Sequence, residues 1–533
     1  MHYVIGSGPS GIAAATALLD RGVPVTMLDV GRTVEPDRHA IVERMSAHEP
    51  EQWSASDIKA IRSRVDAADG RLPLKTAYGS TFPYAMDALR EMRQAGSNCL
   101  QSYAKGGLSN VWGAAVLPNV ARDMTDWPIS LDDLTPHYQQ VARLLPIAAA
   151  SDALADLFPL YGDATAALRP SRQAAALLAH MQQHRRELEA ARLVFGQSRL
   201  AVKTSDDQQG KGCRYTGLCL SGCPYAAIWN AADALDALRA RAHFTYRAGL
   251  IVQRVESLRV DGHVRIDAIA EDGSGRHEFI GKRAFLACGP VSTIRIVIDS
   301  LRAYDQPIGL QFQPYFVLPL MALRGVPGVE TERLHTLAQV FIEMADDSIS
   351  TRTVHLQVYT FNEFIRERVE GITRWLGPGS GSARRQLLGR LLAIQGYFHS
   401  AEAPPIIVTA TPDPMRGLAT LTLTAPPGDH VSELARRVTR ALTRQARRLG
   451  AMPLSPMRVV GKPGDGNHVG GAFPLSRTPG DLETDLLGQL PRLPGVHIVD
   501  SSSLPSLAAT TLTYTTMAHA HRIADGAARL SQG

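Results

Sequence analysis

The first thirty residues constrain the fold of this chain more than any other stretch. A short apolar run, Tyr3–Ile5, is followed at once by the glycine-rich sequence GSGPSG, which spans 6–11. The pattern then predicts a helix over Ile12–Arg21 and a second strand over Val25–Leu28, which ends at Asp29. Strand, glycine turn, helix and strand in this order predict a β-α-β unit of a doubly wound α/β fold.

Each residue type in this unit has a mechanical role in holding a dinucleotide. Gly6 permits a tight turn, Gly8 lets the backbone approach a pyrophosphate, and Gly11 lets the helix pack close to the strand. Ser10 lies at the helix N-terminus, whose free N–H groups attract phosphate. Asp29 follows Gly11 by 18 residues, where an acid hydrogen-bonds ribose hydroxyls. We therefore predict an adenine dinucleotide site, with a purely structural glycine turn as the alternative.

Length and charge narrow the class of protein. With 533 residues, the chain is expected to form two intimately joined domains. A net charge of +5 without a dominant basic cluster argues against a nucleic-acid partner. The absence of an 18-residue apolar run argues against a membrane span. No signal peptide is visible, so we expect a cytoplasmic protein unless a partner subunit carries it elsewhere.

A second glycine-rich segment, KGGLSNVWGAA, begins at Lys105. Gly106, Gly107 and Gly113 allow its backbone to lie against a planar or anionic ligand, and Trp112 is suited to wall a pocket. The segment by itself fits a functional loop and a structural turn equally well.

The sequence GGLSNVWG resembles the flavin-covering loop of the glucose–methanol–choline oxidoreductases, above all the branch near pyranose oxidase and the bacterial FAD-dependent glucose and fructose dehydrogenases. The segment DWPISLDDLTPHY, which starts at Asp126, is similar to a segment of the same branch. The resemblance implies that Gly106, Gly107, Asn110, Trp112 and Gly113 cover an FAD. Pyranose oxidase attaches its flavin through a histidine of this loop. The matching residue here is Val111, which implies a non-covalent FAD.

The resemblance also implies a fold class and a domain organisation. The fold is α/β, with a Rossmann-like FAD-binding domain and an α+β substrate domain built on an antiparallel sheet. Residues 1–125, 196–300 and 456–533 would form the FAD-binding domain. Residues 126–195 and 301–455 would form the substrate domain.

Three of the five cysteines fall within eleven residues, as Cys213-x5-Cys219-x3-Cys223 followed by proline. The run is similar to a ferredoxin ligand string with Thr216 in place of one cysteine. Its spacing resembles the [3Fe-4S] segment of the bacterial glucose and fructose dehydrogenases, which implies a cluster that passes electrons from the flavin to a cytochrome subunit. A zinc site would need a fourth ligand that the neighbouring sequence does not offer. Reduced, buried structural thiols are the other alternative.

The last seventy residues resemble the closing signature of the same family. Asn467 and His468 lie between glycines, and a strand expected over Val496–Val499 ends at Asp500. The resemblance makes His468 the catalytic histidine beside the flavin N5, where a neutral imidazole would remove a hydroxyl proton. It places Asp500 and Thr511 at the flavin.

The family's second catalytic His or Asn is missing, because Ala509 stands at the matching position. Alanine cannot donate a hydrogen bond, so Asn467, Thr511, Tyr514 or a substrate group would have to compensate.

These features predict an FAD-dependent dehydrogenase or oxidase that oxidises a hydroxyl of a sugar or polyol-like substrate, with His468 as base. Electrons would leave through the cysteine cluster to a protein acceptor, or to oxygen or a diffusible acceptor. One alternative is flavin-dependent oxidative tailoring of a biosynthetic intermediate, which the missing second residue favours. The other is a non-catalytic flavin-binding partner subunit.

Overall fold

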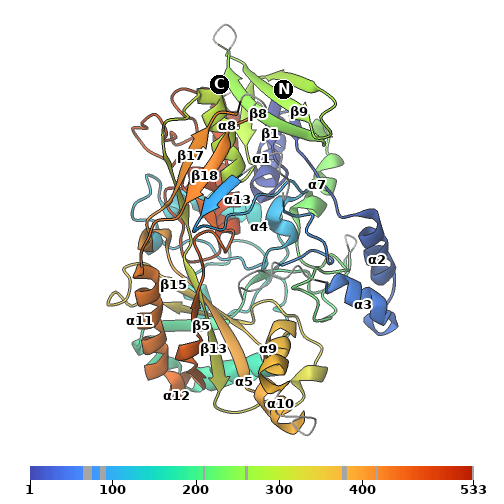
Figure 1. Ribbon diagram of the computed structural model, residues 1–533, viewed down its shortest axis with the longest axis vertical. Coiled ribbons are helices and arrows are strands. Elements are labelled where there is room, and N and C mark those ends of the chain that lie inside the picture. Colours follow the sequence, from blue (N-terminus) through green and yellow to red (C-terminus); the bar gives the residue numbers. More distant parts are fainter. Residues whose placement is uncertain are drawn as a thin grey trace.

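The computed structural model describes residues 1–63, 75–84, 92–207, 210–258, 262–374, 381–413 and 418–530. The molecule is elongated, with a parallel sheet and its helices in one half and a large antiparallel sheet in the other (Figure 1). No helix in these described ranges is long and apolar enough to cross a membrane.

The parallel sheet is built around β1 (His2–Ile5), the first strand of the chain. Its order is β22 (Val496–Ile498), β11 (Arg283–Leu286), β1, β2 (Val25–Leu28) and β7 (Phe244–Arg247), and every pairing is parallel. Every residue of β1 and β2 is buried, as expected for strands covered on both faces. The predicted Rossmann-like sheet is therefore confirmed.

Helix α1 (Pro9–Asp20) packs against the C-terminal helix α13 (Leu512–Leu530). It begins three residues before the predicted Ile12, because Pro9 occupies its first turn, where the fixed φ of proline suits a helix and no N–H is lost. The two ends of the sequence thus lie side by side (Figure 1).

Two further sheets accompany the parallel sheet. The first is antiparallel and contains β8 (Leu250–Ser257), β9 (Val264–Ala270) and β10 (Arg276–Gly281). The second has the order β21 (Val469–Gly470), β12 (Ile308–Phe312), β17 (Ile406–Thr411), β18 (Thr420–Thr424) and β3 (Met92–Ala95). Leu310 and Val408 of the second sheet share one core with Ile5 and Leu286 of the parallel sheet.

The seven-stranded sheet confirms the predicted antiparallel platform. Its order is β19 (Ala451–Pro453), β13 (Tyr315–Ala322), β16 (Leu391–Tyr397), β15 (Val354–Tyr359), β14 (Val340–Met344) and β5 (Leu193–Gln197), with β20 (Val459–Val460) also on β13. Alternate residues Phe316, Leu318 and Leu320 pack against helices α5 (Arg172–Gln183) and α11 (His430–Arg444). The opposite face is therefore free to line a cavity.

The remaining elements connect these sheets. They are α2 (Pro36–Ala47), α3 (Ala55–Ile61), α4 (Leu131–Ala142), α6 (Arg185–Ala190), α7 (Ala231–Arg239), α8 (Pro290–Leu301), α9 (Glu363–Thr373), α10 (Gly381–Leu388), α12 (Ala446–Leu449), and the short pair β4 (Ile147–Ala148) and β6 (Leu200–Ala201). The domain boundaries given by the sequence stay a prediction.

Candidate functional site

One cavity of about 1420 Å³ runs from the first glycine turn to the antiparallel sheet. It is larger than the usual range for a single drug-sized ligand, so it has room for a dinucleotide and a second molecule. The predicted site residues that line it are Gly6, Gly8, Ser10, Asp29, Gly107, Val111, Trp112, Gly113, Asn467, His468, Asp500 and Thr511. Gly11, Gly106 and Asn110 lie behind its wall. The structure thus brings together three segments that lie far apart in the sequence.

The first glycine turn is shaped by close backbone contacts. Gly6 has a φ of +102°, and a Cβ there would lie 2.5 Å from the carbonyl oxygen of Ala287. A Cβ on Gly11 would collide with the carbonyl oxygen of Gly6, so any side chain would separate the helix from the turn. A Cβ on Gly8 would meet no atom within 4 Å, because this position borders the cavity. A phosphate can therefore approach the backbone at Gly8.

Asp29 is held by hydrogen bonds at the same end of the cavity. The Ser7 hydroxyl donates to Asp29 Oδ2, and the Tyr246 hydroxyl donates to the same oxygen at 3.1 Å. The amide of Gly106 donates to Ser7 Oγ at 2.9 Å, which ties the two glycine-rich segments together. Burial raises the pKa of the Asp29 carboxyl to about 6, against the opposing effect of both hydroxyl donors. The carboxylate is therefore ionised at neutral pH and aimed at the cavity.

The second glycine loop is stabilised from behind. Asn110 Nδ2 donates to the carbonyl oxygens of Lys105 at 2.9 Å and Gly107 at 2.7 Å. Gly106 has a φ of +82° and no room for a Cβ beside Ala232. Asn110 and Gly106 thus shape the loop, while its other residues form the cavity wall.

Trp112 is fixed on two sides. Its indole N–H donates to the carbonyl oxygen of Trp229 at 2.8 Å, and Lys75 Nζ donates to its backbone carbonyl oxygen at 2.5 Å. Lys75 also lines the cavity, and burial lowers its pKa to about 8. Sequence reasoning missed Lys75, because no local motif surrounds it.

His468 lines the same cavity as Asp29 and is held by Gln313. Its Nδ1 is 2.5 Å from Gln313 Oε1. Gln313 Nε2 donates to the carbonyl oxygens of Ala508 and, at 2.9 Å, Thr510, so the amide oxygen must face the imidazole. An amide oxygen only accepts, so the proton of His468 resides on Nδ1 and the lone pair on Nε2.

The ring environment keeps His468 neutral. Burial lowers the pKa of His468 to about 4. The ring of Tyr397 lies 5.7 Å from the His468 ring, centroid to centroid. A neutral imidazole with a free Nε2 can accept a proton from a hydroxyl in the cavity.

Ala509 is buried, and no polar group replaces it at that position. Tyr514 does not compensate, because its hydroxyl donates to the carbonyl oxygen of Tyr138 at 2.9 Å, away from the cavity. Thr511 Oγ1 accepts from the amide of Leu117 at 3.0 Å and keeps its own proton for another acceptor. Asn467 adopts a left-handed φ of +57°, and its Oδ1 has no hydrogen-bond partner within the described part of the chain. Asn467 and Thr511 thus remain candidates for the missing role.

Asp500 closes the cavity from the C-terminal strand. The hydroxyl of Thr293 donates to its Oδ2 at 2.6 Å, and the amide of Ser502 donates to its Oδ1 at 2.9 Å. Burial raises the pKa of Asp500 despite these donors.

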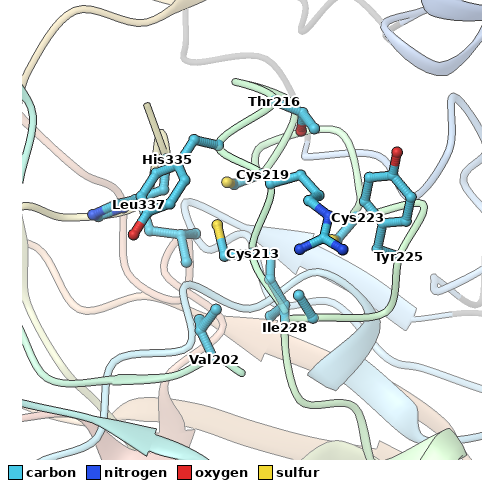
Figure 2. Close-up of a pocket in the computed structure, with 12 residues that line it drawn as sticks. Val202, Cys213, Thr216, Cys219, Cys223, Tyr225, Ile228, His335 and Leu337 are labelled. Carbon is cyan, nitrogen blue, oxygen red and sulfur yellow. The ribbon is translucent and has the colours of Figure 1, made fainter. Parts of the chain in front are cut away.

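The three clustered cysteines line a separate small cavity, together with His335 (Figure 2). Its volume is about 10 Å³, close to the least room that one water molecule needs. Burial and the neighbouring Cys219 raise the pKa of Cys213 to about 12 and that of Cys223 to about 11. Among the described residues, no group of three His, Cys, Asp or Glu side chains is arranged to hold a metal ion. The geometry of this small cavity therefore gives no support to the predicted [3Fe-4S] cluster. It is compatible with three reduced cysteine thiols.

Comparison with known proteins finds relatives by structure only. No protein-family model matches the chain, and no curated protein matches its sequence. Pyridoxine 4-oxidase from Mesorbium loti is similar with a TM-score of 0.60 and 15% identity, over 98% of each chain. An FAD-dependent oxidoreductase from Chaetomium thermophilum is similar with a TM-score of 0.62 and 12% identity, over 100% of this chain and 99% of that one. This chain therefore shares its mixed α/β fold with these two oxidoreductases.

Proposed function

We propose that this protein is an FAD-dependent oxidoreductase that oxidises a carbon bearing a hydroxyl, with His468 as the base. The observation that carries the proposal is the free Nε2 of a neutral His468 in the same cavity as the Gly6 turn and Asp29. Two full-length structural neighbours, one titled a pyridoxine 4-oxidase and the other an FAD-dependent oxidoreductase, support it.

The chemical types of the residues that line the cavity match the parts of an FAD molecule. Asp29 would accept hydrogen bonds from the ribose, and the backbone at Gly8 with the N-terminus of α1 would meet the pyrophosphate. The loop from Gly107 to Gly113 would cover the isoalloxazine ring. Val111 offers no nucleophile, so the flavin would be non-covalent. The N-terminus of α13 borders the cavity through Leu512 and Thr513, and its positive dipole end would favour negative charge there.

In the reaction, His468 Nε2 would accept the proton of the substrate hydroxyl. Gln313 keeps Nδ1 protonated, so the ring presents one defined acceptor to the cavity. The low pKa of His468 keeps that acceptor unprotonated at neutral pH. Bound FAD would supply the hydride acceptor at N5. Thr511 and Asn467, which line the cavity, would orient the hydroxyl where Ala509 cannot.

That the substrate is a sugar or polyol remains a prediction from the sequence resemblance. The walls of the cavity beyond His468 favour the second candidate, oxidative tailoring of a largely apolar biosynthetic intermediate. Aliphatic side chains contribute much of these walls, including Val317, Pro319, Ile365, Leu391, Met457 and Val459, although Arg368, Gln395 and Lys462 also line them. Walls of this kind gain free energy by burying hydrocarbon, whereas a sugar would need polar partners around most of its surface.

The proposal is tested by anaerobic reduction of the purified holoenzyme. The flavin absorbance is followed after mixing with D-glucose, sorbitol, pyridoxine, benzyl alcohol or octan-1-ol. We expect at least one alcohol to bleach the flavin, and His468→Ala to slow bleaching by about 100-fold or more, the usual contribution of a positioned base. His39→Ala, on the exposed helix α2, is the control. Equal rates in His468→Ala and the wild type would refute the role of His468.

An electron-acceptor protein remains a prediction. The [3Fe-4S] cluster that would pass electrons to it also remains a prediction. Iron and acid-labile sulfide are measured in the same preparation. Flavin without iron would identify Cys213, Cys219 and Cys223 as structural thiols. Three irons per chain would require the small cysteine cavity to open around them.

A further inference from the structure

A row of polar side chains crosses the cavity-facing side of the seven-stranded sheet. Tyr397 on β16 pairs with His355 on β15, and His355 pairs with Glu343 on β14. Gln357 and Tyr359 lie on the same face as His355, because strand residues two apart share a face. The side chains of His355 and Glu343 are 0% and 1% exposed. An acid and an imidazole buried in otherwise apolar strands are costly, so they need an explanation.

Hydrogen bonds join four of these residues into a chain. His355 Nδ1 lies 2.6 Å from Glu343 Oε1, and His355 Nε2 lies 3.1 Å from Gln357 Nε2. The Tyr359 hydroxyl lies 2.9 Å from Gln357 Oε1. The chain therefore runs along β15 from a buried carboxylate to a tyrosine.

The Glu343 carboxylate determines which group donates and which accepts in each hydrogen bond from Glu343 to Tyr359. Glu343 Oε1 accepts, so His355 carries its proton on Nδ1. The lone pair on His355 Nε2 then requires the Gln357 amide nitrogen to donate, which turns Gln357 Oε1 toward Tyr359. Tyr359 donates its only proton to that oxygen. Its hydroxyl can therefore only accept from a further group.

The free end of the chain reaches the cavity. Gln357 and Tyr359 both line it, as does Tyr397 beside His468. Tyr359 lies four residues beyond His355, about 13 Å along a strand. Because Tyr397 stands opposite His355, Tyr359 is well separated from the reacting end of the cavity. The cavity walls contributed by the neighbouring segments include Ile365, Leu391 and Ala393, together with the polar Asn362 and Arg368.

We propose that Tyr359 determines substrate specificity by accepting a hydrogen bond from a second hydroxyl or N–H group of the substrate, remote from the hydroxyl that reacts at His468. Glu343, His355 and Gln357 are its positioning residues. The substrate is then an elongated, mainly apolar alcohol with a hydrogen-bond donor toward its far end. This inference rests on the proposed function and adds the substrate class to it.

The test compares octane-1,8-diol with its monomethyl ether, 8-methoxyoctan-1-ol. Both present the same reacting hydroxyl, but only the diol carries a donor at the far end. Binding to the holoenzyme is followed by the change in the flavin absorbance spectrum, and reduction is followed by bleaching. We expect the wild type to bind the diol about 3- to 10-fold more tightly than the ether, the usual effect of one neutral hydrogen bond.

Variants separate recognition from folding. Tyr359→Phe should bind both alcohols equally, with the affinity that the wild type shows for the ether. Gln357→Leu should raise the affinity for the ether, because Tyr359 is then free to donate to the ether oxygen. A general loss of structure would not produce that gain. Tyr161→Phe, outside the cavity and stacked on Tyr138, should keep the wild-type preference.

A spectroscopic measurement tests the positioning residues directly. In protein labelled with ¹⁵N-histidine, the signals lost in His355→Gln should show a protonated Nδ1 and an unprotonated Nε2. The opposite tautomer would overturn the proposed direction of the chain.

The outcomes of the alcohol experiment are also distinct. A wild type that binds neither alcohol, or a Tyr359→Phe variant that still prefers the diol, would overturn this inference. Preferential binding of the diol without bleaching by any alcohol would leave this inference standing and refute the proposed function.

Discussion

Gln313 and His468 form a hydrogen bond of 2.5 Å between amide oxygen and imidazole Nδ1, and the same amide is anchored through Nε2 to the carbonyl oxygens of Ala508 and Thr510. The segment around Ala509, where the sequence resemblance implies a second catalytic residue, thus sets the tautomer of the proposed base His468. The backbone on either side of Ala509 does this through Gln313, without using the side chain of Ala509.

The first prediction concerns Gln313. Gln313→Leu removes the acceptor of the Nδ1 proton, so His468 loses its preferred tautomer and orientation. We expect flavin reduction to slow by about 5- to 10-fold, the usual effect of one hydrogen bond, while FAD stays bound. Stopped-flow absorbance measures the rate and the bound flavin together. Unchanged reduction would show that Gln313 does not orient the base.

The pH dependence of flavin reduction follows from the pKa of His468. The neutral imidazole is the active form, and its pKa of about 4 lies below the ordinary value of 6.5. The rate should therefore be flat from pH 8 to pH 5 and fall only as the pH approaches 4. Rapid pH-jump mixing measures this profile before the protein can unfold. An inflection near pH 6.5 would contradict the environment described for His468.

Asp29→Asn should weaken FAD binding by about 10- to 100-fold, because a carboxylate acceptor contributes more than a neutral amide. Wild-type affinity should also fall below about pH 6, since the carboxyl of Asp29 then takes up a proton. Flavin fluorescence during titration of the apoprotein with FAD measures both effects. Asp37→Asn, on the exposed surface of α2, is the control and should bind FAD as the wild type does.

Buried histidines should make stability increase with pH between about 4 and 6.5, while the raised pKa of the Asp29 carboxyl acts in the opposite direction below about pH 6. Burial lowers the pKa of His137, His468 and His497 to about 4, so the unfolded chain binds protons in this range that the folded chain does not. Each such histidine changes the free energy of unfolding by up to about 1.4 kcal/mol per pH unit. Thermal unfolding at a series of pH values measures the slope.

The variant His497→Gln tests the contribution of one buried histidine to this pH dependence of stability. The His497 ring is stacked on Phe285 at 4.8 Å, and its Nδ1 lies 2.8 Å from the carbonyl oxygen of Leu487, away from the proposed chemistry. The variant should show a shallower dependence of Tm on pH than the wild type. An identical slope would mean that His497 is protonated alike in both states.

Local patterns predicted the fold well because the relevant interactions lie close in sequence. The strand Val25–Leu28 was predicted with its observed bounds, and the glycines at 6 and 11 contact each other within one turn. Helix α1 begins three residues before the predicted Ile12, because Pro9 has the backbone conformation of a first helical turn. The antiparallel sheet was expected from the sequence resemblance, and the seven-stranded sheet confirms it.

The polar groups of the site were harder to predict. Gln313 and Lys75 stand in no motif, and only contacts across more than 30 residues give them a partner. His355 and Glu343 did leave a signal, since each interrupts an apolar strand whose neighbours are all buried. That sequence signal indicates that His355 and Glu343 form a buried polar pair. It does not indicate which part of the protein the two side chains contact.

The sequence by itself determined the dinucleotide-binding unit, since a glycine turn, a helix start and an acid at the end of the next strand act over fewer than thirty residues. Only the tertiary structure decided how His468 carries its proton and how Tyr359 presents its oxygen. These properties depend on hydrogen bonds from Gln313 and Gln357, whose directions follow from the groups that chain folding brings around them. A hydrogen bond between side chains requires atoms within about 3 Å, and no local spacing in the sequence specifies that approach.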